Sequence, residues 1–230
     1  MTGKARHPAP PPTRLTVVNG DLSFARWPVV VGHYIGDSIA GSEAELDAAL
    51  GGALRRRYAL GVYPGAVGTA IVAQHPARSD RLGVVVGLGD MAAFNVGAVR
   101  SAIVSGLLEL ALTGDVPGGV AGVALVMLGA RAGVIPTVEI LSAMLGGVAE
   151  AQRRLPEQGL ARFADVQLIA QMEDSAHLAW HNLARLTAQP RFAASFALHP
   201  EIEFSLGAAR RITRIADTDA WRVKIGRAHV

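Results

Sequence analysis

A glycine turn provides the first candidate for ligand chemistry. Residues 87–92 read Gly-Leu-Gly-Asp-Met-Ala, which fits the dinucleotide fingerprint G-x-G-x-x-G/A directly after a predicted strand. Glycines at such a turn let backbone amides approach a pyrophosphate at the start of a helix. The candidate ligand-binding residues are therefore Gly87, Gly89, Asp90 and Asn95.

Two observations favour a plain tight turn at the same residues. The next helix is predicted to begin near Asn95, which moves its positive end away from the two glycines. The acidic residue that the fingerprint places about 20 positions further on would be Glu109, which falls in the middle of that helix. The sequence is therefore compatible with a nucleotide turn and with a plain tight turn.

Other catalytic patterns are weak or missing from the sequence. His177 and His181 share a helical face near Asp174, but Leu178 stands where a metalloprotease helix has Glu, which favours a polar helix face. The chain has no cysteine, which excludes a thiolate nucleophile, a disulfide and a Cys-based zinc site. It contains neither G-x-S-x-G nor a P-loop. We expect no catalytic residue, no metal and no cofactor.

Charge and hydropathy narrow the classes of partner. The 22 basic and 19 acidic residues give a net charge of +3, which is no electrostatic case for nucleic acid. The longest apolar stretch, residues 116–138, is interrupted by glycines and Arg131, so no membrane span is predicted. The first residues lack the apolar core of a signal peptide, which predicts a cytoplasmic protein. Only 18% of residues are charged, which favours self-association as a homodimer.

Strands and amphipathic helices alternate along the chain. The helix that starts at Ser42 has a capping box, because Glu45 follows three residues later, and Asn95 is predicted to cap another helix. Strands are predicted at 15–18, 28–32, 69–73, 82–86, 120–128 and 165–171, with short pieces at 202–204 and 211–215. Helices are predicted at 42–54, 95–110, 136–155 and 174–186. This order predicts an α/β fold, a layered sheet covered by helices on both faces.

Composition divides the chain into four parts. Residues 1–14 are predicted to be a disordered Pro-rich tail, and residues 15–190 the α/β domain. Residues 191–224 are expected to be a linker or the start of a following region. Residues 225–230 resemble the translation of a sequencing adapter, which suggests an artefact at the end of a truncated gene.

Two families resemble this sequence. The order VVVGHYIGDSIAGSEAELDAALGGAL, TAIV and VVVGLGDMAAFNVGAVRSAIVSGLLELAL is similar to the amino-terminal domain of leucyl aminopeptidases. That resemblance implies a macro-domain-like fold with nothing catalytic in this part.

A longer resemblance covers nearly the whole ordered chain. The segments VGHYIGDSIAGSEAELD, LGVYPGAVGTAIV, VVVGLGD and RRITRIADTDAWRV resemble the leading region of large bacterial CHAT-domain proteins, which carry a caspase-like peptidase module downstream. This resemblance implies a non-enzymatic regulatory or interaction domain whose partners are the downstream domain and a further protein. The alternative function is a nucleotide or ADP-ribose binding domain that uses the turn from Gly87 to Asp90.

Overall fold

The computed structural model describes residues 10–113, 121–129 and 135–209. Its strands are β1 (Thr13–Asn19), β2 (Val29–Tyr34), β3 (Ala70–His75), β4 (Arg78–Gly89), β5 (Gly122–Val126), β6 (Asp165–Ala170), β7 (Phe196–Leu198) and β8 (Glu203–Phe204). Its helices are α1 (Ser42–Ala49), α2 (Ala53–Ala59), α3 (Val96–Leu112), α4 (Thr137–Arg154), α5 (Glu173–Thr187) and α6 (Pro190–Ala193). The short 3-10 helices are η1 (Leu22–Phe24), η2 (Met91–Ala93) and η4 (Pro156–Gln158).

These strands form one mixed sheet in the order β3-β4-β2-β5-β6-β1-β7, with β8 also paired to β1. β3 runs antiparallel to β4, and the other pairs are parallel. Parallel neighbours require crossover connections, which the helices between the strands provide. The strand β2 therefore lies inside the sheet, between β4 and β5.

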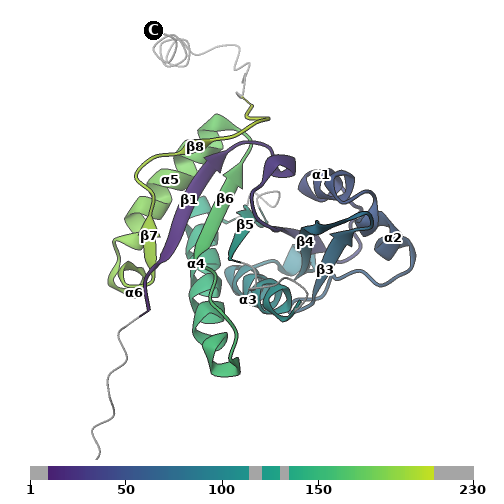
Figure 1. Ribbon diagram of the computed structural model, residues 1–230, viewed down its shortest axis with the longest axis horizontal. Coiled ribbons are helices and arrows are strands. Elements are labelled where there is room, and N and C mark those ends of the chain that lie inside the picture. Colours follow the sequence, from purple (N-terminus) through teal and green to yellow (C-terminus); the bar gives the residue numbers. More distant parts are fainter. Residues whose placement is uncertain (1–9, 114–120, 130–134, 210–230) are drawn as a thin grey trace, which may run out of the picture.

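Helices cover both faces of the sheet, as the sequence predicts (Figure 1). The strand β4 shows why, because successive side chains point to opposite faces. Val84 and Val86 pack in the larger core with α3, α4 and α5. Val85 packs in the smaller core with Leu46 of α1 and Leu54 of α2. Strands buried on both faces explain the continuous apolar runs of the sequence.

The predicted capping box at Ser42 is wrong. Gly41 is the N-cap residue, its φ is 54°, and no side chain caps the helix. Ser42 is already helical, because the backbone of Gly41 accepts the first bond from the Glu45 amide. The predicted helix 42–54 also divides into α1 and α2 at a pair of glycines, Gly51 and Gly52.

The sheet continues beyond residue 190, where the sequence predicts the domain to end. The strand β7 pairs with the first residues of β1, from Thr13 to Leu15, and β8 pairs with Val18 and Asn19. β8 agrees with the predicted strand at 202–204, whereas β7 has no sequence signal because a three-residue strand shows no periodicity. The predicted strand at 211–215, residues 225–230 and most of the Pro-rich tail lie outside the described residues.

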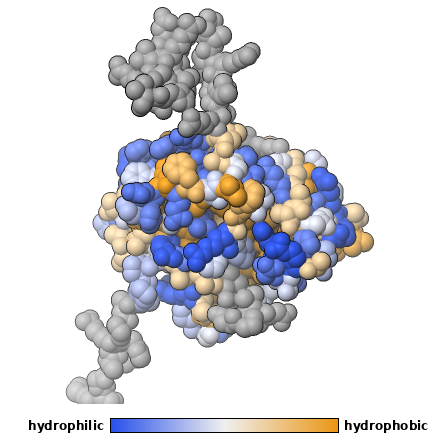
Figure 2. All heavy atoms as spheres, turned by 45° about the horizontal axis from the view of Figure 1, so that its top comes forward, coloured by the Kyte–Doolittle hydropathy of each residue, from blue (hydrophilic) through white to orange (hydrophobic). Residues whose placement is uncertain are grey.

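Neither the surface shown nor the described helices form a long apolar region. On the face shown in Figure 2, hydrophilic and hydrophobic residues are interspersed. Among the described residues, no helix combines the length and the apolar character needed to cross a membrane.

Candidate functional site

A cleft opens where β2 and β5 separate. These two strands pair only at Val29 with Ala124 and at Val30 with Leu125. Beyond that point the chain leaves β2 towards α1 on one face and leaves β5 towards α4 on the other face. In open α/β sheets, ligands bind outside the carboxyl ends of strands at such a divergence. We call this space the β2/β5 cleft.

The β2/β5 cleft has a volume of about 210 Å³. Ligand sites for drug-sized molecules usually enclose roughly 300–1,000 Å³, so this cleft holds a small molecule or one group of a larger one. No Lys or Arg occurs among the described residues that line it. The lining residues are Gly32, Tyr34, Asp37, Ala40, Gly41, Ser42, Glu43, Leu88, Val126, Met127, Leu128 and Gly129.

Tyr34 supplies an unpaired polar atom to this lining. Its side chain is 5% exposed, and its hydroxyl has no hydrogen-bond partner among the described residues. The ring makes an edge contact with Phe94 at a centroid distance of 5.4 Å. Burial raises the pKa of the Tyr34 phenol, and the nearby Asp37 carboxylate adds to the effect. A buried hydroxyl without a partner is unfavourable, and a ligand that accepts from it would remove the penalty.

The start of α1 forms another wall of the cleft. No side chain caps this helix, and of its first amides that of Glu43 donates to the Ala40 carbonyl at 3.2 Å. Uncapped amides and the helix dipole together favour an anionic or strongly accepting group. Glu43 lies in this first turn, but its carboxylate takes part in a separate buried network.

That network joins three side chains, His33, Glu43 and Tyr63, which we call the His33 cluster. The Nδ1 atom of His33 lies 3.0 Å from Oε1 of Glu43, and the Tyr63 hydroxyl donates to the same oxygen at 2.9 Å. His33 is 4% exposed and Glu43 is 5% exposed. The Tyr63 ring also meets the His33 ring edge-on at 4.8 Å. Burial raises the pKa of the Tyr63 phenol, and the Glu43 carboxylate raises it further.

Strand alternation places the two features on opposite faces. His33 and Tyr34 are consecutive in β2, so their side chains leave the sheet in opposite directions. Tyr34 packs in the core beneath α3 and α4, whereas His33 meets Glu43 of α1. One dipeptide therefore supplies the buried hydroxyl of the cleft and the anchor of the His33 cluster.

The predicted residues Gly87 and Gly89 pack against the loop at residues 65–69. The Gly87 amide donates to the Thr69 carbonyl at 2.9 Å, and the Gly89 amide donates to the Gly65 carbonyl at 2.8 Å. A Cβ atom at Gly87 would overlap the carbonyl oxygen of Ala66. Both amides are thus used within the fold, and neither glycine lines the cleft.

Asp90 and Asn95 act as caps in this structure. The Asp90 side chain accepts from the Ala92 amide at 2.8 Å at the start of η2. Asn95 accepts from the Ala98 amide at 3.1 Å, which confirms it as the N-cap of α3. Leu88, between the two glycines, is the part of the turn that reaches the cleft.

The polar face of α5 provides no group of ligands among the described residues. No cluster of three His, Asp or Glu side chains that could hold a metal is found in that part of the chain. His177 and His181 are exposed, and Trp180 donates its indole N–H to the His199 carbonyl at 3.1 Å.

Sequence reasoning missed the residues that line the cleft and form the His33 cluster. Their only signal is that His33, Glu43 and Tyr63 fall in two of the segments quoted for the longer resemblance. The cleft itself depends on the pairing of β2 with β5, which are far apart in the chain.

No protein-family model matches the chain. No curated protein matches its sequence either.

Solved structures show the fold. A macrodomain of Trypanosoma brucei in complex with ADP superposes with a TM-score of 0.56 at 12% identity, covering 76% of this chain and 77% of that one. The same macrodomain in complex with ADP-ribose gives 0.55 at 12% identity, covering 76% and 78%. A glycine-to-valine mutant of the Oceanobacillus iheyensis macrodomain with ADP-ribose gives 0.55 at 13% identity, covering 76% and 94%. The chain therefore has a macrodomain-like α/β fold, as the leucyl aminopeptidase resemblance implies.

Proposed function

We propose that this chain binds an ADP-ribose or nucleotide-type ligand in the β2/β5 cleft. The observation that carries the proposal is the buried Tyr34 hydroxyl, which lines the cleft and has no partner among the described residues. The position of the cleft, at the divergence of two parallel strands, supports a ligand site independently. Structural neighbours in complex with ADP and ADP-ribose support this class of ligand.

Each wall of the cleft suits a different part of such a ligand. The uncapped start of α1, at Gly41 and Ser42, suits a phosphate or another accepting group. The Tyr34 hydroxyl donates to a ribose or phosphate oxygen. At about 210 Å³ the cleft encloses one ribose phosphate unit, and the rest of the ligand extends outside it.

This placement differs from the predicted nucleotide turn. Gly87 and Gly89 support the loop at 65–69 and do not themselves face the ligand. The proposed activity is binding, since Glu43, the buried carboxylate beside the cleft, already accepts from Tyr63 and contacts His33.

Calorimetric titration of the whole chain with ADP-ribose, ADP, AMP and ribose 5-phosphate tests the proposal. We expect saturable binding of at least one of them, and loss of that binding in Ala40→Trp, which fills the cleft. Ala188→Trp is the matched control, because Ala188 is exposed at the end of α5 and does not line the cleft. Absence of binding at about 1 mM ligand, a weak limit for nucleotide sites, would overturn the proposal.

The second candidate is an interaction domain at the front of a CHAT-type protein. Three exposed apolar side chains, Ile35, Val62 and Val67, favour it because they lie within segments quoted for that resemblance. Sequencing across the Val223 codon tests whether the reading frame continues. In a longer protein, slower hydrogen exchange at these three positions would support an interface there, and unchanged exchange would contradict it.

A further inference from the structure

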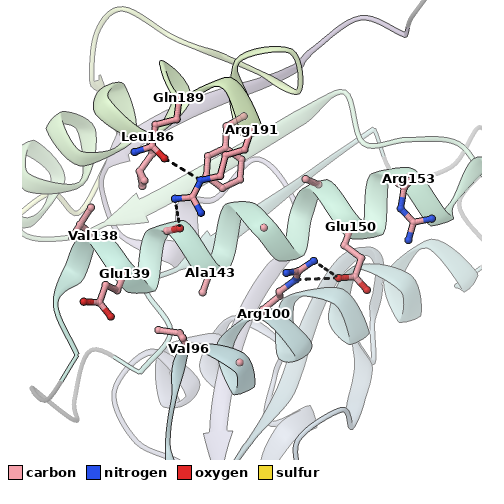
Figure 3. Close-up of a pocket in the computed structure, with 15 residues that line it drawn as sticks. Val96, Arg100, Val138, Glu139, Ala143, Glu150, Arg153, Leu186, Gln189 and Arg191 are labelled. Carbon is pink, nitrogen blue, oxygen red and sulfur yellow. Dashed lines mark hydrogen bonds and ion pairs between the residues drawn. The ribbon is translucent and has the colours of Figure 1, made fainter.

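A second hollow, unrelated to the β2/β5 cleft, runs along the outer side of α4. Its volume is about 940 Å³, and it is bordered by α3 on one side and by α5 and α6 on the other (Figure 3). Arg100 reaches α4 from α3 and contacts Glu150 at 2.8 Å. Arg191 reaches it from α6 and donates to the Ser142 hydroxyl at 3.2 Å. The outer side of α4 is thus open between two arginine side chains.

The residues of α4 that line this hollow follow a regular spacing. They are Val138, Glu139, Ser142, Ala143, Gly146, Ala149, Glu150 and Arg153. The positions 139, 143, 146, 150 and 153 alternate steps of four and three, which keeps them on one side of a helix. We call these five positions the α4 seam. Small residues in its middle let another helix approach closely.

Charge makes the α4 seam complementary to itself. Exposed Glu139 lies at its amino end and exposed Arg153 at its carboxyl end, with Gly146 midway between them. In a second copy turned antiparallel about Gly146, Glu139 of each chain faces Arg153 of the other. The same rotation brings Glu150 towards the Ser142 of the second copy, where Arg191 of that copy already lies. A twofold axis repeats each of these contacts, as an isologous interface requires.

We propose that two copies of this chain associate through the α4 seam, with the two α4 helices antiparallel and crossing at Gly146. The occupant is a second copy because one helix carries both halves of the charge pattern. Within the described part of one chain, Arg153 pairs with Glu157 at 2.9 Å, an exposed i, i+4 pair of small energetic value. Exchanging that contact for a pair across the interface therefore costs little.

Sedimentation of the full chain over a range of concentrations measures the dimer. We expect E139R and R153E each to weaken the dimer about tenfold or more, since each change disrupts two pairs and places like charges together. Mixing the two variants should restore association, because one then carries arginine at both 139 and 153 and the other carries glutamate at both positions. R56E is the control, since Arg56 is an exposed arginine on α2 and should leave the dimer unchanged.

Loss of the dimer can be distinguished from loss of the fold, because both substituted positions are exposed and circular dichroism shows whether each variant is folded. A dimer that is weakened by each variant and restored by the mixture supports the proposal. A monomer at all concentrations overturns it. A dimer whose affinity is unchanged by both charge reversals has its interface elsewhere, which also overturns the proposal.

Discussion

The carboxylate of Glu43 lies between His33 and Tyr63, with its Oε1 atom 3.0 Å from His33 Nδ1 and 2.9 Å from the Tyr63 hydroxyl. These residues come from β2, the first turn of α1 and the loop after α2. The contact therefore fixes the start of α1, which is one wall of the β2/β5 cleft. No side chain caps α1, so the buried contacts of Glu43 with His33 and Tyr63 hold the start of this helix in place of a cap.

Glu43→Gln tests this anchor. The amide keeps the size of the side chain but loses the charge and one of two accepting oxygens. Because the partners are buried, we expect a loss of about 2–3 kcal/mol in the free energy of unfolding. Denaturant titration measures this free energy. Asp80→Asn is the control, because the Arg78–Asp80 pair is exposed and its loss should change stability by less than about 0.5 kcal/mol. Equal effects in the two variants would contradict an anchoring role.

Stability at alkaline pH should depend on Tyr63. Its pKa is raised from 10.0 in the folded chain by burial and by Glu43. Above pH 10 the unfolded chain releases this proton while the folded chain retains it, so the free energy of unfolding falls as pH rises. Tyr63→Phe should flatten the fall by up to about 1.4 kcal/mol per pH unit. Denaturant titrations between pH 9 and pH 11, a range centred on the pH at which free tyrosine is about half ionised, measure the slope. A slope that Tyr63→Phe leaves unaltered would contradict this role of Tyr63.

Tyr34→Phe should separate stability from binding. Removing a buried hydroxyl without a partner should leave the free energy of unfolding unchanged or raise it by about 1 kcal/mol. The same change should weaken ligand binding in the β2/β5 cleft about tenfold, because one hydrogen bond to the ligand is lost. Thermal denaturation and calorimetric titration give the two quantities. Lower stability with unaltered affinity would assign the hydroxyl to the fold alone.

The fold was predictable because its central elements are long and regular. The apolar runs at 28–32 and 82–86 mark buried strands, and Asn95 marks the start of a helix. The polar start of β4, from Arg78 to Arg81, was not predicted because it has no hydrophobic pattern, and in the strand register only Arg78 of this stretch is paired with β3, at His75. The capping-box prediction failed because Ser42 is the first residue of α1 and not its N-cap. The spacing of Ser42 and Glu45 is the same in both cases, so the sequence does not distinguish them.

The place of the candidate site was not predictable from the sequence. The spacing of Gly87 and Gly89 matches a phosphate turn, but the same spacing serves a close backbone approach. Sequence cannot tell the two apart, because the partner of these glycines is the distant loop at 65–69. Tyr34 gave no signal, since a tyrosine at the end of an apolar strand is ordinary and only the structure shows that its hydroxyl has no partner among the described residues.

Gly87→Ala decides between these two roles of the glycine turn. A Cβ atom there would overlap the backbone of Ala66 and lie 2.5 Å from Thr69 Oγ1, so the loop at 65–69 must move. We expect a loss of about 3 kcal/mol in the free energy of unfolding, the upper end for overpacked buried positions, because backbone atoms must move. Gly36→Ala is the control, because its φ of 77° costs an alanine roughly 1–2 kcal/mol but its Cβ would meet nothing within 4 Å. If Gly87→Ala folds with unchanged stability and loses only ligand affinity, the turn contacts the ligand directly and the packing explanation fails.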